Sequence, residues 1–120
     1  MWIAMNDSFV SIVQSRDCDS EVVVRARVRE DLVALFPTWE SLIIESEDSD
    51  YRFRLFMDKE AVSYVIRDRI LDIDYDNFKN SIDHKTQPWR YRAYTRIWQT
   101  LYTVQEQKYG PSRWFNYRKN

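Results

Sequence analysis

The chain has 120 residues, of which 44% are hydrophobic and 16% aromatic. This length suits one domain with a single core, and the aromatic content argues against a disordered chain. The formal net charge of −1 hides an uneven distribution: residues 1–87 hold 11 Lys and Arg against 18 Asp and Glu, and residues 88–120 hold 7 against 1. This uneven distribution predicts a polar partner or an internal clasp between the two ends of the chain.

Composition also limits the cellular compartment and the kinds of ligand site. Cys18 is the single cysteine, which excludes an intrachain disulfide and favours a reducing compartment. The single glycine excludes a Gly-rich phosphate loop. No apolar run approaches membrane-spanning length, and the start MWIAMNDSF lacks the pattern of a secretory signal. We therefore expect a cytoplasmic protein without membrane contact and without a cofactor.

The first third of the chain predicts three strands and a helix. Trp2–Met5 and Phe9–Gln14 form a hairpin around a polar turn. Residues 21–29 alternate between apolar and basic side chains, as in a half-buried strand. Arg29–Phe36 has a helical apolar face, and Pro37 ends this helix.

The middle of the chain predicts two more strands and a long helix. Leu42–Glu47 and Tyr51–Met57 flank a turn, and alternation places Tyr51 on the apolar side of its strand. Asp58 is a good N-cap for a helix that reaches about Ile73. The residues expected on its inner side are Val62, Val65, Ile66, the stem of Arg69, Ile70 and Ile73.

The remaining elements complete the predicted fold. A short helix is expected near Tyr75–Ile82, capped by Asp74 or Asp76. Pro88 opens a last helix, whose expected core stripe is Tyr91, Tyr94, Trp98, Leu101 and Tyr102. The order βββα–ββααα predicts an α+β protein, with an antiparallel sheet of about five strands and helices packed on one face. Residues 1–110 are expected to form one domain, followed by an aromatic and basic tail over residues 111–120.

Four arginines form the first candidate binding surface. Arg25 and Arg27 share one strand face, and Arg52 and Arg54 share another. If the two strands are neighbours, the four guanidinium groups form a patch that can hold phosphates or carboxylates. Glu45 and Glu47 alternate in the same way, so cross-strand ion pairs could instead occupy the patch. Both interpretations remain open at this point.

Residues 72–83 carry acidic side chains at alternate positions, which is partly typical of a calcium-binding loop. However, Asn77 stands where such a loop has glycine, and Lys79 stands where it has an apolar residue. Helix capping explains the acids better, and we expect no metal. His84 has no group near it in sequence that would orient it as a base, and Cys18 lies between two acids that disfavour a thiolate. We therefore expect no enzymatic activity.

The tail is the second candidate binding surface. Its partner-binding candidates are Arg113, Trp114, Phe115, Tyr117 and Arg118. Aromatic side chains interleaved with cations can stack on unpaired bases while they neutralise phosphates. They can also dock on the acidic body of the same chain or on a second copy, as in a homodimer. We expect docking within the chain or across a dimer.

Several stretches together resemble a family of short uncharacterised proteins of bacteria and phages. The stretches are MWIAMNDSFVSIVQ, VVVRARVREDLVALFP, DYRFRLF, IDYDNFKNSI and AYTRIWQTLYTVQ. The resemblance covers nearly all of residues 1–105 and brings no activity, cofactor or catalytic residue. It implies a small cytoplasmic accessory protein of a bacterium or a phage, which acts on a host or defence protein.

The sequence therefore predicts a small non-enzymatic protein-interaction or regulatory module, whose partner is another protein or a second copy of itself. The alternative is an accessory protein that binds nucleic acid through Arg90, Arg92, Arg96 and the tail. These two functions differ in how steeply binding depends on salt.

Overall fold

The computed structural model describes residues 1–112. The chain divides into two compact units, with the boundary after Asp76. The first unit contains the sheet and the second is helical, and the expected single domain over residues 1–110 stays a prediction. Each unit is described by itself.

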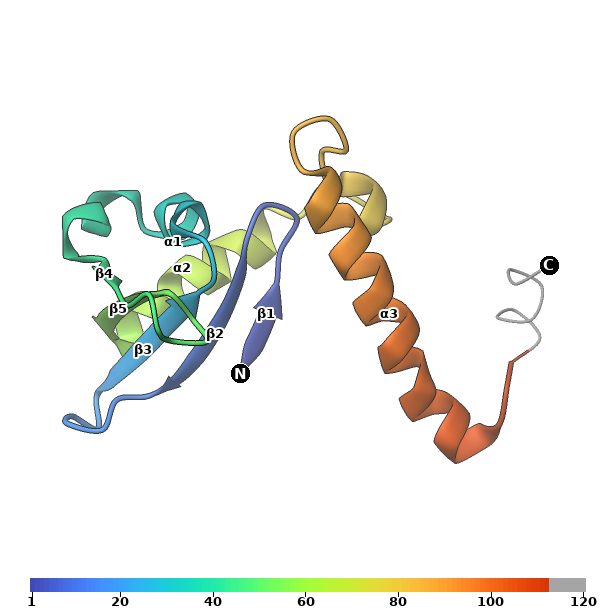
Figure 1. Ribbon diagram of the computed structural model, residues 1–120, viewed down its shortest axis with the longest axis horizontal. Coiled ribbons are helices and arrows are strands. Elements are labelled where there is room, and N and C mark those ends of the chain that lie inside the picture. Colours follow the sequence, from blue (N-terminus) through green and yellow to red (C-terminus); the bar gives the residue numbers. More distant parts are fainter. Residues whose placement is uncertain (113–120) are drawn as a thin grey trace. The chain divides into compact units, whose positions relative to one another are not determined.

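The first unit is built on a five-stranded antiparallel sheet (Figure 1). The strand order across the sheet is β1-β2-β3-β5-β4. The strands are β1 (Trp2–Ala4), β2 (Phe9–Gln14), β3 (Glu21–Ala26), β4 (Ile44–Glu45) and β5 (Phe53–Asp58). The α+β class and the antiparallel sheet of five strands are as the sequence predicts.

Two helices of this unit, α1 (Arg29–Leu35) and α2 (Lys59–Leu71), cover one face of the sheet (Figure 1). Alternate residues of the central strands point toward them, as period-two patterning requires. The buried core consists of Val10, Val22, Val24, Ala26, Leu32, Leu35, Phe36, Leu55, Met57 and Val62. Helix α2 begins as predicted, because the Asp58 side chain accepts a hydrogen bond from the Glu60 amide.

The fourth strand is much shorter than the sequence predicts. A 3-10 helix occupies Pro37–Leu42, so only Ile44 and Glu45 pair with β5. Proline at the first position has a fixed φ that suits a helical turn, and the Trp39 amide donates to the carbonyl of Phe36. Leu42, the expected first residue of the strand, therefore belongs to this 3-10 helix instead.

The second unit, from Asn77 onward, contains a 3-10 turn at Lys79–Ser81 and helix α3 (Pro88–Tyr109). Ile82 and Tyr94 are buried, and the Tyr94 ring stacks on Phe78 at 5.7 Å between centroids. The Asn77 side chain, rather than Asp74 or Asp76, accepts a hydrogen bond from the Asn80 amide at the start of the turn. Gly110 ends α3 with a positive φ of 76°, as its position after the last helical residue predicts.

The helices bury less of their apolar surface than the periodicity predicts. On α2, Ile70 and the following Ile73 are 61% and 51% exposed. On α3, Leu101 is 62% exposed, and Trp98 is half-buried against Lys79 and Tyr102. A helical stripe identifies residues that can be buried, but burial also needs an apolar surface of the same unit to pack against them.

Candidate functional site

The four candidate arginines lie on or beside the sheet face opposite the core. Strands β3 and β5 are direct neighbours, and Arg25 lies directly opposite Arg54 in the register. The acidic strand β4 lies at the edge, beyond β5, rather than between them. The strand order therefore brings two of the four guanidinium groups onto adjacent positions of one face.

For Arg52, the structure confirms the hypothesis of ion pairing with the acidic residues of the neighbouring segment. Arg52 forms ion pairs with Glu45 at 2.7 Å and with Glu47 at 3.4 Å. Among the described residues, Arg25, Arg27 and Arg54 form no such ion pair. The patch is thus divided: Arg52 is paired with two carboxylates, whereas the other three have no carboxylate partner within residues 1–112.

Tyr51 lies between two of these arginines, which corrects its expected place on the core side of its strand. Tyr51 is 4% exposed, and the guanidinium carbons of Arg25 and Arg27 lie 4.7 and 4.4 Å from the centroid of its ring. The segment between β4 and β5 crosses in front of the sheet (Figure 1). Strand β5 begins only at Phe53, so alternation does not reach Tyr51. The ring instead covers the arginine face and holds the two side chains by cation–π contact.

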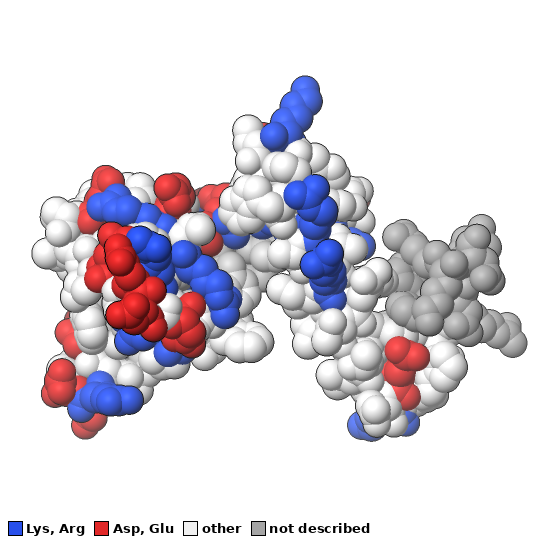
Figure 2. Space-filling view, viewed as in Figure 1, with Lys and Arg blue, Asp and Glu red and all other residues white. Residues whose placement is uncertain are grey.

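Charge is mixed over the sheet and more uniform on α3. In Figure 2, basic side chains over the sheet are interspersed with acidic ones, whereas this face of α3 carries mainly Lys and Arg. Arg92 and Arg96 of α3 are exposed, but Arg90 is 3% exposed, donates to Gln87 and Tyr94, and lies over Trp89. Arg90 is therefore part of the helical unit's packing.

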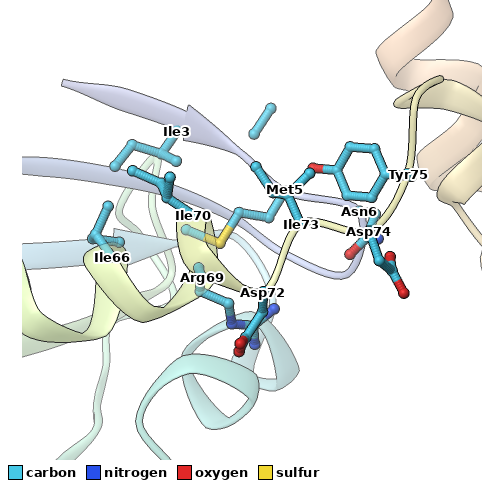
Figure 3. Close-up of a pocket in the computed structure, with 11 residues that line it drawn as sticks. Ile3, Met5, Asn6, Ile66, Arg69, Ile70, Asp72, Ile73, Asp74 and Tyr75 are labelled. Carbon is cyan, nitrogen blue, oxygen red and sulfur yellow. The ribbon is translucent and has the colours of Figure 1, made fainter.

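An apolar groove along α2 is a second candidate surface, which the sequence analysis missed. One cavity of about 430 Å³ is bordered by residues 3–6 and by the end of α2 and the segment after it, with Ile3, Met5, Ile70 and Ile73 among its walls (Figure 3). An adjoining cavity of about 380 Å³ shares Ile3, Ile66 and Ile70. The two together form a groove, defined here as the β1–α2 groove. The signal that could have revealed it is the apolar run Ile70, Leu71 and Ile73 at the end of a helix, which is more than one face of a helix can bury.

The free edge of β1 borders this groove. Met1 and Ile12 exchange backbone hydrogen bonds, so in antiparallel alternation the next bonded pair is Ile3 with Val10. The backbone groups of Trp2 and Ala4 therefore point away from β2, at an edge of the sheet. Ala4 also forms part of the groove wall, and Trp2 is 74% exposed. An unpaired edge beside an apolar groove is a template for an added strand.

In the acidic segment at residues 72–83, the last acid, Asp83, stabilises a turn. The Asp83 carboxylate accepts hydrogen bonds from the amides of Lys85 and Thr86 at 3.0 and 3.4 Å. The bond from the Lys85 amide, with smaller contributions from Thr86 and His84, lowers the pKa of Asp83 below its usual 3.8. Within residues 1–112 there is no cluster of three or more His, Cys, Asp or Glu side chains that could hold a metal ion.

The other reactive residue types are His84 and Cys18, which belong to different units. His84 is exposed, and its ring lies 4.1 Å from the ring of Tyr91. Cys18 is exposed, with its Sγ 3.1 Å from the Ser20 hydroxyl. The candidate tail residues Arg113, Trp114, Phe115, Tyr117 and Arg118 lie outside the described residues, so their docking stays a prediction.

The chain was compared with protein-family models, curated proteins and solved structures. No protein-family model, no curated protein and no solved structure matches the chain. Among the described residues, no helix has both the length and the apolarity needed to cross a membrane.

Proposed function

We propose that this protein is a protein-interaction module that binds an extended segment of its partner along the edge of β1. The observation that carries the proposal is the position of the β1–α2 groove beside an unpaired strand edge. Backbone hydrogen bonds from such an edge provide affinity without regard to sequence, and pockets for alternate side chains provide specificity.

The chemistry of the groove defines the segment that it suits. Its walls include the apolar side chains of Ile3, Met5, Ile66, Ile70 and Ile73, which favour an aliphatic side chain. Asp72 and Asp74 border one end and are exposed. Arg69 also lines this cavity but is paired with Asp7, so a basic residue beside the aliphatic one would complement the two exposed carboxylates at that end of the groove. The resemblance to short bacterial and phage proteins directs the search for the partner to host and defence proteins.

The test is a selection of peptides from a random displayed library on the full chain. We expect enrichment of an aliphatic residue flanked at alternate positions by Lys or Arg. Binding of a selected peptide should weaken at least tenfold in Ile70→Gln and stay within twofold in Leu71→Gln. Leu71 is a matched control, because it is the next residue on the helix, is 66% exposed and lines neither cavity. An equal loss of peptide affinity in both variants would contradict binding in the β1–α2 groove.

Hydrogen exchange then tests the mode of binding. The amides of Trp2 and Ala4 should exchange more slowly with the peptide bound, while those of Ile44 and Glu45 at the opposite edge should not change. If the Trp2 and Ala4 amides become protected as protein concentration rises, with no peptide present, the edge of β1 binds a second copy of the chain instead of a partner segment. Steeply salt-dependent binding of a single-stranded oligonucleotide, lost when residues 111–120 are deleted, would support the nucleic-acid alternative instead.

A further inference from the structure

A cavity on the opposite face of the sheet has a different chemistry from the β1–α2 groove. It encloses about 330 Å³, within the range of sites for small molecules. Arg25 and Arg54 form part of its wall, and Arg16 is a third cation beside them. The other lining residues are Val13, Gln14, Asp17, Val23 and Phe56. With three arginines and one aspartate, the cavity lining is cationic in a unit whose acids outnumber its bases.

In the part of the chain that the structure describes, no carboxylate forms an ion pair with Arg25 or Arg54. Each guanidinium donates from Nη2 to a neutral hydroxyl at 2.7 Å, Arg25 to Ser11 and Arg54 to Ser49. The Nε atom of each is buried and has no hydrogen-bond partner in the described part of the chain. Arg29, Arg52 and Arg69, in contrast, each pair with a carboxylate within 2.9 Å.

This arrangement is unfavourable for folding by itself. Like charges directly opposite each other on neighbouring strands repel, and a buried N–H group without a partner loses its hydration. The sequence contains enough acids to neutralise both arginines, yet the strand order keeps Glu45 and Glu47 on the far side of β5 with Arg52. Two half-buried cations that share one cavity form a site complementary to an anion.

We infer that this cavity binds a small organic oxyanion, a phosphate or carboxylate carried on an apolar group. The oxyanion would lie between the Arg25 and Arg54 guanidinium groups, which the β3–β5 register places opposite each other. Contact with the Tyr51 ring holds Arg25, and a hydrogen bond to Ser49 holds Arg54. The apolar group would rest on Val13, Val23 and Phe56. This site is on the opposite face from the β1–α2 groove and does not depend on the function proposed there.

The test uses phenyl phosphate as the probe, at constant ionic strength, and follows the Arg Nε–Hε signals of the full chain by nuclear magnetic resonance. We expect saturable shifts of the Arg25 and Arg54 signals, with amide shifts at Val23 and Phe56. Affinity should fall at least tenfold in Arg54→Gln and stay within twofold in Arg67→Gln. Arg67 is a matched control because it loses the same charge on an exposed helix position outside this cavity.

Two further measurements keep the test decisive. Val13→Glu places a carboxylate at the exposed rim and should also weaken binding at least tenfold, even if Arg54→Gln does not fold. Benzoate should shift the same signals as phenyl phosphate, because the shared feature is the oxyanion. The inference is overturned by an absence of saturable shifts up to about 10 mM probe, an affinity far below that of a specific small-molecule site, or by equal weakening in Arg54→Gln and Arg67→Gln.

Discussion

Arg69 on α2 and Asp7 in the β1–β2 turn, 62 positions apart in the chain, form an ion pair in which Nη1 of the arginine donates to both carboxylate oxygens, at 2.9 and 3.0 Å. The same guanidinium donates from Nη2 to the carbonyl of Ala34 at the end of α1. One side chain therefore connects the hairpin, α1 and α2. A second contact supports the first, because the buried Asp31 of α1 accepts a hydrogen bond from the Phe9 amide of β2.

The Arg69–Asp7 pair provides the first prediction. Asp7→Ala should lower the free energy of unfolding by about 1 kcal/mol, because the pair is partly buried and its guanidinium also donates to the Ala34 carbonyl. Glu40→Ala, which removes the more exposed pair with Arg29, should cost less than about 0.5 kcal/mol. Urea unfolding of both variants, in parallel, checks the difference. Equal losses would show that the Arg69 contacts have no special structural role.

The opposed arginines provide the second prediction. Arg54→Met keeps most of the aliphatic stem and removes one of two like charges, so stability at low ionic strength should rise by about 0.5 kcal/mol. The gain should shrink as salt screens the repulsion. Arg67→Met is the control, with a change within about 0.5 kcal/mol expected at an exposed site. A loss above about 1 kcal/mol in Arg54→Met would mean that the arginine stabilises the sheet and is not a strained binding group.

Burial in the sheet unit provides the third prediction. Leu55→Ala should destabilise by about 2–5 kcal/mol, because Leu55 is 0% exposed at the centre of the core. Leu71→Ala should change stability by less than about 0.5 kcal/mol, since that side chain is 66% exposed. Thermal unfolding of the two variants measures the contrast. A large effect of Leu71→Ala would place it in a contact that the described core does not include.

The turn at Asp83 provides a prediction on pH. The lowered pKa means that the folded turn favours the ionised carboxylate, so its contribution to stability is present above pH 3.8. That contribution is lost as pH falls through the lower pKa of the folded state. A titration by nuclear magnetic resonance should give a pKa for Asp83 below 3.8, with the amide signals of Lys85 and Thr86 moving at the same midpoint. An Asp83→Asn variant should lack this transition, and a midpoint at or above 3.8 would show that the turn does not hold the carboxylate.

Local patterns determined much of the first unit before any contact was known. Alternation identified β3 and its core-facing residues, Asp58 identified the start of α2, and Pro37 identified the end of α1. These features depend on side-chain periodicity and on the backbone restrictions of single residues, which act over a few positions.

The candidate sites depended on relationships that no local pattern contains. The sequence suggested the arginine patch but could not say that β3 and β5 are neighbours with Arg25 opposite Arg54 while Arg52 turns to Glu45. It also placed Ile70 and Ile73 in the core, although the sheet ends at a short β1 that leaves them beside an open groove. Strand order and the extent of the sheet are set by packing between distant segments, so only the tertiary structure decided which charges are paired and which apolar side chains are covered.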